Sequence, residues 1–267
     1  MPLAVCATPI GNLDDVTLRV LDELRAADVV LCEDTRHTRI LLERHSIRAR
    51  LLSYHEHNEA KRTAELVPRL VAGERMALVS DAGMPGISDP GARLVGAALD
   101  AGVRVTVLPG PSAVETALVA SGLVGEPYLF LGFLPRGRSA LAAVWKELGA
   151  WPHAAVAFES PGRLPATLAS LAGAEPDREV AVCRELTKVH EEIVRGRAVD
   201  VALRFGDPPR GEITLVIGPG PEPTADLAEG AKAVADLVGE GLSRRRAAEI
   251  VAHLTGASRN ELYRRTL

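Results

Sequence analysis

Cysteine is scarce in this chain of 267 residues, and its three copies lie far apart at Cys6, Cys32 and Cys183. An odd and scattered set is not the pattern of a disulfide framework, and it lacks the paired spacing of a zinc site. Two of the three cysteines stand in apolar, strand-like runs. We therefore expect all three to pack in the interior and to take no part in chemistry.

Long apolar runs are also lacking. No segment approaches the roughly 20 apolar residues that a membrane helix needs. The first residues, Met1–Cys6, begin a strand pattern at once, without the basic segment and cleavage site of an export signal. We expect a cytoplasmic protein with no membrane partner.

Aromatic residues make up only 3% of the chain, although 47% of it is hydrophobic. This length and apolar content suit two modest domains and an appendage better than one small core. The high apolar fraction with so few aromatic residues is one reason to expect a homodimer. The sequence has neither a G-x-G-x-x-G motif after its first strand nor a P-loop, so these two nucleotide-binding fingerprints are excluded.

The first half has instead a repeated passage from a buried strand into a polar loop. The clearest copy is the apolar run Arg75–Val79, followed by the glycine, proline, serine and aspartate residues of Ser80–Gly91. The other expected strands and the loops after them are Leu3–Ala7 with Thr8–Asn12, Val29–Cys32 with Glu33–Arg36, and Val103–Leu108 with Pro109–Ala113. Ligands bind beyond the carboxyl ends of the strands in open α/β sheets, so this edge predicts a binding site. Turn and capping chemistry alone would explain the same residue types.

Helices are expected between these strands. Asp14 or Asp15 would open one of them, with Leu18, Leu21 and Leu24 on a single face.

Two histidines, His55 and His57, are two residues apart and could be metal ligands if both faced one way on a strand. No third ligand stands at a useful spacing. We expect them at a helix start with their side chains in solvent, and we expect no metal site.

The second half reads as a smaller α/β or mixed-sheet domain followed by helices. Ser121–Pro127 is flexible, polar and aperiodic, which is typical of an interdomain crossing. The expected strands are Tyr128–Phe133, Ala154–Phe158, Val180–Cys183 and Ile213–Ile217, with a helix at Leu164–Leu171. Gly218–Pro223 would end the domain as a semi-rigid linker. The fold class is therefore α/β, with domains over residues 1–120 and 126–218 and a helical appendage over residues 225–267.

Charge is unevenly distributed along the chain. Residues 241–267 carry a net charge of +4 within a total of −4, so the remainder carries −8. An anionic partner would have to be met by local basic patches, of which there are two. One is this tail and the other is the segment 36–50, which holds five arginines. The alternative for each patch is a solvated helix face.

The tail gives a further indication of an anionic partner. Ser243 would cap a helix that begins with three arginines, and Ser258–Glu261 has the form of a capping box. Three cations at the positive end of a helix are locally unfavourable, so another group should compensate for them. An RNA phosphate would do so, since it meets both the arginines and the free N–H groups of the first turn. The expected RNA-binding arginines of the tail are Arg244, Arg245, Arg246, Arg259, Arg264 and Arg265.

Eight short motifs, taken together, are similar to those of a known family. They are Thr8–Leu13, Glu33–Arg36, His57–Glu59, Ser80–Gly91, Pro109–Ala113, Gly132–Pro135, Glu159–Pro161 and Arg184–Lys188. In this order, and over the whole chain, they resemble the ribosomal RNA small subunit methyltransferase I family, which has the tetrapyrrole-methylase fold. Two positions depart from the family pattern: Met84 stands where threonine is more usual, and Gly162 where histidine is.

The resemblance implies transfer of a methyl group from S-adenosylmethionine to the ribose 2′-oxygen of a cytidine in the decoding region of 16S rRNA, in the small ribosomal subunit. It also implies two α/β domains with the cofactor folded between them, usually in a homodimer. The cofactor-binding residues it implies are Pro9, Val79, Ser80, Asp81, Met84, Ser112, Ala113, Glu159 and Leu186. The catalytic candidates are Asp34, Glu185 and Lys188, as a base near the ribose hydroxyl. Arg36 and Arg163 could hold flanking phosphates.

Two other functions are also compatible with the sequence. The same fold supports a methylase of the precorrin or uroporphyrinogen type, although a small macrocycle does not need the basic tail. A non-catalytic RNA-binding or ribosome-assembly protein with a vestigial pocket would bind the cofactor without turnover.

Overall fold

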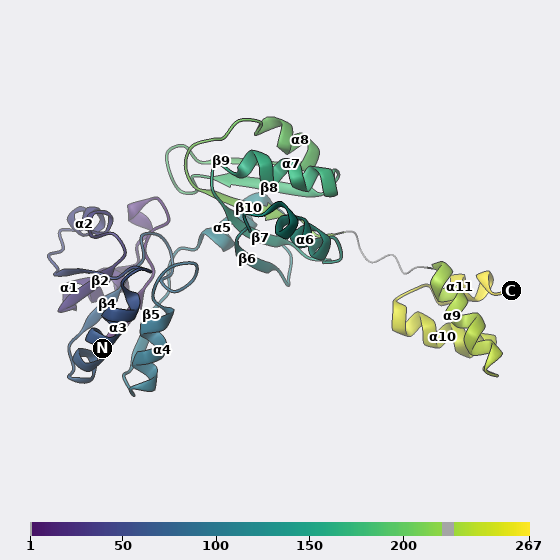
Figure 1. Ribbon diagram of the computed structural model, residues 1–267, viewed down its shortest axis with the longest axis horizontal. Helices are drawn as coiled ribbons and strands as arrows, with labels where there is room; N and C mark the ends of the chain where they lie inside the picture. The colour runs from purple at the N-terminus through teal and green to yellow at the C-terminus, as the bar shows by residue number, and fades with distance from the viewer. Residues whose placement is uncertain (1, 221–226) are drawn as a thin grey trace. The chain divides into compact units, whose positions relative to one another are not determined.

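The computed structural model of the protein describes residues 2–220 and 227–267 (Figure 1). The chain divides into two compact units. The first comprises Met1–Lys146 and His153–Pro219 and holds two β-sheets, and the second comprises Glu147–Pro152 and Gly220–Leu267 and is helical. Among the described residues, no helix is long and apolar enough to cross a membrane.

The first sheet has five parallel strands in the order β3-β2-β4-β1-β5. They are β1 (Leu3–Cys6), β2 (Val29–Cys32), β3 (Leu51–Ser53), β4 (Met76–Leu78) and β5 (Val105–Leu108). The three central strands are buried throughout, as their continuous apolar sequences predict. The strand expected from Val103 begins only at Val105.

Helices cover both faces of this sheet. They are α1 (Leu18–Ala26), α2 (Thr35–Arg44), α3 (Glu59–Val71) and α4 (Ala92–Asp100). Successive residues of β1 alternate between two apolar clusters: Leu3 packs with residues of α3 and α4, and Ala4 with residues of α1 and α2. All three cysteines of the chain are buried and unpaired, as expected.

One helix starts later than predicted. Asp14 lies in a short 3-10 helix, η1 (Leu13–Asp15), and α1 begins only at Leu18 because Thr17 is its N-cap. Thr17 Oγ1 accepts a hydrogen bond from Val20 N at 3.2 Å, which satisfies one of the free N–H groups of the first turn. Leu18 is 79% exposed, so the predicted apolar face is formed by the later leucines only.

The second sheet is mixed, with strands in the order β6-β7-β10-β8-β9. They are β6 (Leu129–Phe133), β7 (Ala155–Glu159), β8 (Glu179–Arg184), β9 (Glu192–Arg197) and β10 (Ile213–Ile217). Only β6 and β7 are parallel, and the other neighbouring pairs are antiparallel. The edge strand β9 was not predicted, because its sequence is charged at every second or third position.

Four helices accompany this second sheet. They are α5 (Ala113–Ser121), α6 (Arg138–Gly149), α7 (Leu164–Ala174) and α8 (Ala198–Arg204). Residues of α5 share an apolar cluster with Val156 of β7 and Val216 of β10. The chain therefore passes from the first sheet to the second at Pro109–Ser112, whereas the crossing was expected at Ser121–Pro127.

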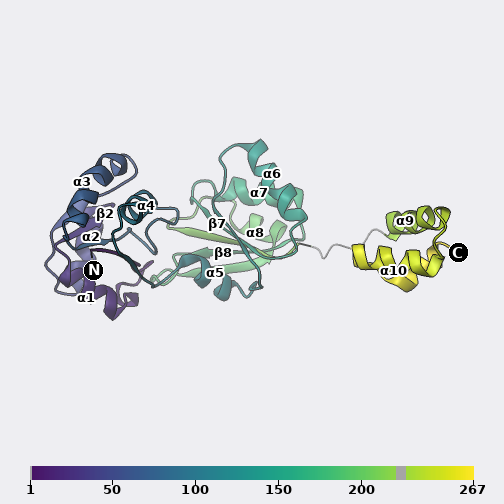
Figure 2. The ribbon, with the colours of Figure 1, turned by 90° about the horizontal axis from the view of Figure 1, so that it is seen from below.

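The second unit is a small helical bundle. It consists of α9 (Leu227–Gly239), α10 (Arg244–Thr255) and α11 (Arg259–Arg265), and α9 and α10 lie side by side (Figure 2). Ser243 caps α10 as predicted, with its hydroxyl accepting from Arg246 N. The predicted capping box at Ser258–Glu261 is wrong, since the Ser258 side chain makes no cap hydrogen bond and only its carbonyl accepts from Glu261 N. The expected linker Gly218–Pro223 lies partly outside the described ranges, which end at residue 220 and resume at residue 227.

Candidate active site

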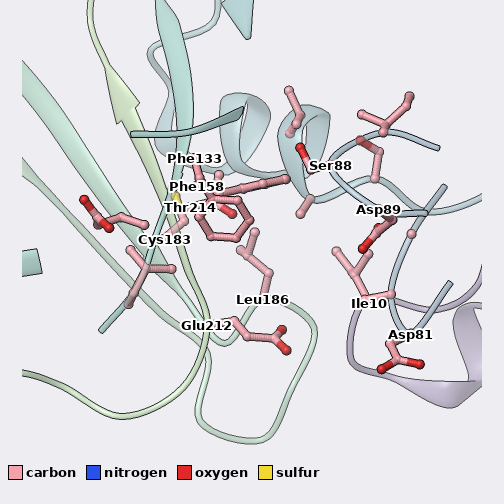
Figure 3. Close-up of a pocket in the computed structure, with 18 of the residues that line it drawn as sticks. Ile10, Asp81, Ser88, Asp89, Phe133, Phe158, Cys183, Leu186, Glu212 and Thr214 are labelled. Carbon is pink, nitrogen blue, oxygen red and sulfur yellow. The ribbon is translucent and has the colours of Figure 1, made fainter. Parts of the chain in front are cut away.

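A cavity of about 440 Å³ lies in the first unit where loops of both sheets meet (Figure 3). The loop after β4 and the start of α5 form one wall, and strands β6, β7, β8 and β10 with their loops form the other. The residues that line it include Ile10, Asp81, Met84, Ser88, Asp89, Ser112, Phe133, Phe158, Glu159, Leu186, Glu212 and Thr214. The cavity thus combines aromatic and aliphatic side chains with carboxylates and hydroxyls, which is the usual composition of a small-molecule site.

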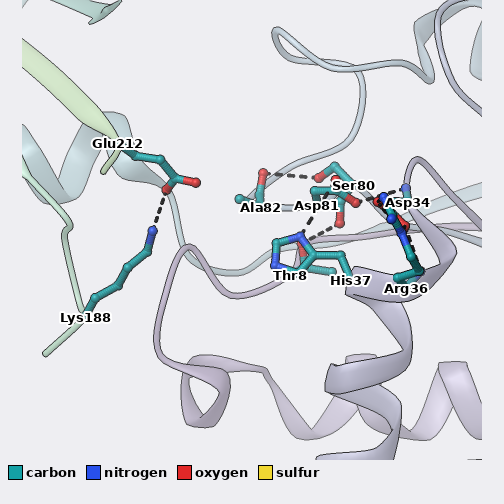
Figure 4. A network of polar contacts seen from close by, with 9 residues as sticks. All are labelled: Thr8, Asp34, Arg36, His37, Ser80, Asp81, Ala82, Lys188 and Glu212. Carbon is teal, nitrogen blue, oxygen red and sulfur yellow. Dashed lines mark hydrogen bonds and ion pairs between the residues drawn. The ribbon is translucent and has the colours of Figure 1, made fainter. Parts of the chain in front are cut away.

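The loop after β4 is held in place by its own polar groups (Figure 4). Thr8 Oγ1 donates a hydrogen bond to Ser80 O at 3.0 Å, and Ser80 Oγ donates to the carbonyls of Ala82 and Gly83. The backbones of Thr8 and Gly83 are also paired. Gly91 closes the loop with a φ of 140°, where a side chain would meet Gly86 N at 3.2 Å. The loops after β1 and β4 therefore form one rigid support.

Six of the nine expected cofactor residues line this cavity: Asp81, Met84, Ser112, Ala113, Glu159 and Leu186. Pro9 and Ser80 line a neighbouring cavity of about 100 Å³, and Val79 is buried in the core of the first sheet. Asp81 lines both cavities, as well as a third, polar cavity of about 480 Å³. The structure brings the loops of the expected site together, and the roles of their residues stay predictions.

Two carboxylates near the first-sheet loops, Glu33 beside the polar cavity and Asp89 on the main cavity, have no ion-pair partner among the described residues, whereas Asp81 lies 3.8 Å from His37. Burial, reinforced by the charges of Glu33 and Asp81, raises the pKa of Asp89 to about 6. Burial likewise raises the pKa of Glu33, with the charge of Asp81 as the next cause. Among the described residues, neither Glu33 nor Asp89 has a cation within salt-bridge distance, and Figure 3 shows Asp89 directed into the cavity. Asp89 belongs to the motif Ser80–Gly91, but the sequence did not identify it as a site residue.

The second-sheet wall has a different electrostatic character. The Glu159 side chain is fully buried and accepts hydrogen bonds from Ser160 N (2.7 Å) and Thr167 Oγ1 (2.6 Å). Arg163 Nη2 lies 3.3 Å from Glu159 and also donates to the carbonyls of Leu134 and Pro135. Arg163 is thus engaged inside the domain at this nitrogen, although it was expected to hold an RNA phosphate.

Two catalytic candidates, Glu185 and Lys188, form a network with Glu212. Lys188 Nζ lies 2.9 Å from Glu185 Oε1. It also lies 3.0 Å from Glu212 Oε2 (Figure 4). The hydrogen bond from Glu212 N and that from Lys188 lower the pKa of Glu185. Burial lowers the pKa of Lys188, but its hydrogen bonds to the two glutamates outweigh burial and raise it. Both residues are charged at neutral pH, and neither is suited to take up a proton.

This network also touches the loop after β1. Asn12 N donates a hydrogen bond to Thr187 Oγ1 at 2.9 Å. A side chain at Gly11 would approach Lys188 Cγ and Thr187 Oγ1 to 2.6 Å, so only glycine fits at this contact.

The third catalytic candidate, Asp34, is paired with Arg36. Its carboxylate accepts from Arg36 N at 2.8 Å and from Arg36 Nη2 at 2.6 Å. These side-chain and backbone hydrogen bonds lower the pKa of Asp34 well below its usual range. Both residues line the polar cavity of about 480 Å³, with His55 and His57. Among the described residues, no group of three histidine, cysteine, aspartate or glutamate side chains could hold a metal ion.

The arginines of the tail are arranged around one acidic residue. Arg245, Arg246 and Arg259 lie 3.3–3.6 Å from the Glu249 carboxylate. Glu249 therefore supplies part of the compensation that the cations at the start of α10 were expected to need. Arg264 and Arg265, at the end of α11, are exposed.

Residues 2–202 match the family described as Tetrapyrrole (Corrin/Porphyrin) Methylases, and residues 224–267 match the RsmI C-terminal HTH domain. A protein named Ribosomal RNA small subunit methyltransferase I from Mesorhizobium japonicum is 44% identical over 99% of this chain and 91% of its own length. A protein of the same name from Thermotoga maritima is 45% identical over 80% of this chain and 97% of its own length. This chain belongs to the ribosomal RNA small subunit methyltransferase I family.

Solved structures confirm the expected fold class for this family member. The uroporphyrin-III C-methyltransferase of Thermus thermophilus, complexed with S-adenosyl homocysteine, superposes with a TM-score of 0.58 at 18% identity, over 81% of this chain and 96% of that one. A conserved hypothetical protein from Aeropyrum pernix gives a TM-score of 0.62 at 19% identity, over 99% of this chain and 94% of that one. The expectation of S-adenosylmethionine as cofactor is in keeping with both the family and these folds.

Proposed function

We propose that this protein transfers the methyl group of S-adenosylmethionine to the ribose 2′-oxygen of a cytidine in 16S rRNA of the small ribosomal subunit. The observation that carries the proposal is the similarity to named rRNA methyltransferases over nearly the whole chain, the helical unit included. That unit is the argument against a tetrapyrrole substrate, since the tetrapyrrole methylase match ends at residue 202. A ribosomal substrate would place the activity in the cytoplasm.

The main cavity suits the proposed cofactor. Its volume of about 440 Å³ falls in the range of small-molecule sites, and it has both an apolar side and a polar side. Phe133 and Phe158 offer apolar surface, and the rings of Phe130 and Phe133 both stack edge-on against Phe158. Asp81 and Ser112 offer an acceptor and a hydroxyl at a strand end and a helix start. When bound, S-adenosylmethionine supplies an electrophilic methyl group on a positively charged sulfur.

The protein's part in such a transfer is alignment and exclusion of water. The rigid pair of loops after β1 and β4 fixes Asp81 at the junction of three cavities, so it can contact both cofactor and substrate. The apolar side chains of Phe158 and Leu186 keep water from the opposite wall. Carboxylates near the cavity favour a bound cation over a neutral ligand.

The decisive experiment combines labelled S-adenosylmethionine with small subunits that lack the modification, followed by mapping of the labelled nucleotide. Label on the 2′-oxygen of one cytidine is the expected result. Cofactor binding without transfer would favour the assembly protein, and transfer to a uroporphyrinogen but not to subunits would favour the tetrapyrrole methylase.

The helical unit is proposed to bind RNA phosphates through the arginines of α10 and α11. Replacing Arg244, Arg245 and Arg246 by glutamine should weaken binding to small subunits and leave cofactor affinity unchanged. The log–log slope of affinity against salt should become shallower by about one unit for each phosphate that the variant no longer binds. Arg19→Gln with Arg25→Gln, on α1, is the matched control. Unchanged binding and slope in the triple variant would reduce the unit to a solvated helical cap.

A homodimer is also proposed. Exposed apolar side chains occur on the edge strand β5 (Val107, 53%), on α5 (Val119, 72%) and before β6 (Val124, 63%), where a second copy could cover them. Sedimentation should give twice the chain mass of 28.3 kDa at micromolar concentration. A monomer under these conditions would contradict the proposal.

A further inference from the structure

The carboxylate of Asp89 has a position that the proposed roles do not yet use. It lines the main cavity, is half-buried, and makes no hydrogen bond or ion pair with any other described residue. The other carboxylates of this cavity have partners: Glu159 holds Thr167, Glu212 holds Lys188, and Asp81 accepts from Asp34 N at 3.2 Å. A half-buried carboxylate normally acquires a donor, so a free one facing a cavity is available to a ligand.

The backbone around Asp89 is held in an unusual conformation. Ser88 has a φ of 61°, which is rare for a residue with a side chain, and Gly86 and Gly91 have φ values of 84° and 140°. The two glycines pack against each other so closely that a side chain on either would meet backbone atoms within 3.3 Å. Such conformations persist where the surrounding structure fixes them, and they concentrate at functional sites. The loop therefore aims Asp89 into the cavity and keeps it there.

We propose that Asp89 is the base of the reaction, accepting the proton of the ribose 2′-hydroxyl as that oxygen bonds to the methyl carbon. This inference rests on the proposed function. A new O–C bond forms, and the S–C bond breaks with its electron pair remaining on sulfur. The positive sulfonium becomes a neutral thioether, and the O–H proton moves to an oxygen of the Asp89 carboxylate. Atoms and charge balance without any further reactant.

The surrounding charges suit Asp89 to this task better than the three candidates drawn from the sequence. A general base is most effective when its pKa lies near the working pH. The pKa of Asp89 is about 6, whereas hydrogen bonds lower the pKa values of Asp34 and Glu185, and Lys188 is a protonated ammonium. The groups that act on Asp89 are Glu33 after β2 and Asp81 after β4, both acidic.

The charges of Glu33 and Asp81 would also couple proton uptake by Asp89 to the loss of the cofactor's positive charge. A bound cation opposes the repulsion from Glu33 and Asp81, so it keeps Asp89 ionised and ready to accept a proton. Once that positive charge is gone, the repulsion again favours protonated Asp89. Proton uptake by Asp89 thus replaces the lost positive charge in the cavity.

The first test measures binding and needs no turnover. Affinities for S-adenosylmethionine and for S-adenosyl homocysteine are determined by calorimetry between pH 5 and 8. The preference for the cationic ligand should rise several-fold as the pH rises through about 6, because Asp89 attracts the sulfonium only when its carboxylate is ionised. In Asp89→Asn this rise should be absent, and in the control Asp100→Asn, an exposed residue at the far end of α4, it should persist. A pH-dependent preference that survives in Asp89→Asn would overturn the proposal.

The second test measures a single turnover on small subunits. Asp89→Asn should slow methyl transfer at pH 7 by about 100-fold or more, while Asp89→Glu should recover part of the rate and Asp100→Asn should retain it all. The rate of the wild-type protein should rise with pH through the titration of Asp89, and that of Asp89→Asn should not. Asp89→Asn within about threefold of an active wild-type protein would overturn the role of Asp89 alone. An inactive wild-type protein would overturn the proposed function, and the role of Asp89 with it.

Discussion

The two walls of the main cavity differ in how their ionisable groups are satisfied. On the wall from the second sheet, each carboxylate is tied to protein donors, as Glu159 is to Thr167 and Arg163 and as Glu212 is to Lys188. On the wall from the first sheet, Asp89 has no cation or hydrogen-bond donor beside it among the described residues, and its burial and the charges of Glu33 and Asp81 raise its pKa. The second-sheet wall is therefore a scaffold, whereas the charge of Asp89 on the first-sheet wall is left to be stabilised by a ligand.

The largest loss of stability is expected when Glu159, the central carboxylate of the second-sheet wall, is removed. Glu159→Ala should lower the free energy of unfolding by about 3–5 kcal/mol, because it leaves the buried Thr167 hydroxyl without its acceptor and removes the carboxylate that balances the charge of Arg163. Urea denaturation measures the effect. Glu159→Gln, which keeps an acceptor for Thr167, should cost less. A loss below about 1 kcal/mol for Glu159→Ala would mean that this wall is no more committed to stability than the other.

The contrast between the walls also explains which parts of the molecule could be predicted from the sequence. The central strands of the first sheet are buried on both faces, so they read as unbroken apolar runs, and their carboxyl ends all lie at one edge. Locating Asp81 and Ser112 at the cavity required no more than this rule. Antiparallel strands send loops to both ends of a sheet, and the rule fails for them. Thr214, near the start of β10, was therefore not identified, because only the antiparallel pairing of β10 with β7 brings it to the cavity. Phe133 and Phe158, at the ends of the parallel strands β6 and β7, were not identified because an apolar side chain in a strand reads as part of the core.

The electrostatics of the site were beyond prediction for a related reason. The pKa of Asp89 depends on its burial and on Glu33, which follows a different strand, and neither is visible in the local sequence. The catalytic candidates Asp34 and Glu185 accept hydrogen bonds from Arg36, in the first turn of α2, and from Glu212, on a loop that only folding brings close. A sequence shows which residues carry a charge, and the structure shows which of those charges are neutralised.

Removing the charge of Asp89 on the first-sheet wall should have the opposite effect and raise the free energy of unfolding. The folded protein binds the Asp89 proton more tightly than the unfolded chain does, with a pKa of about 6 against 3.8. Its contribution to the free energy of unfolding therefore falls as the pH rises through this window. Asp89→Asn should raise the free energy of unfolding by about 1–2 kcal/mol at pH 7, allowing for partial exposure, and by almost nothing near pH 3.

Urea titrations of wild type and Asp89→Asn at both pH values measure this gain, with Asp100→Asn expected to stay within about 0.5 kcal/mol of wild type. A loss of stability in Asp89→Asn at pH 7 would show that Asp89 has a structural partner, and the two walls would then be alike.

The smallest effect on stability is expected at Arg36, whose partner Asp34 lines the polar cavity and not the main one. Asp34 resembles the scaffold carboxylates, since the Arg36 side chain and backbone hold its pKa below the usual range. Arg36→Gln removes the guanidinium but keeps the backbone hydrogen bond, so the pKa of Asp34 should rise towards its ordinary value without reaching it. Stability should not change measurably, because the pair is exposed and such pairs contribute little. Carbon-detected NMR titration gives the pKa, and Arg25→Gln, which breaks the exposed pair with Asp22, is the control.

The Arg36→Gln variant also decides between Asp34 and Asp89 as the base of the reaction. If Asp34 took the proton, a higher pKa would make it the better base, and Arg36→Gln would speed single-turnover transfer at saturating substrate. With Asp89 as the base, the rate should stay the same, or fall if Arg36 also holds an RNA phosphate, so a faster Arg36→Gln variant would return the catalytic role to Asp34.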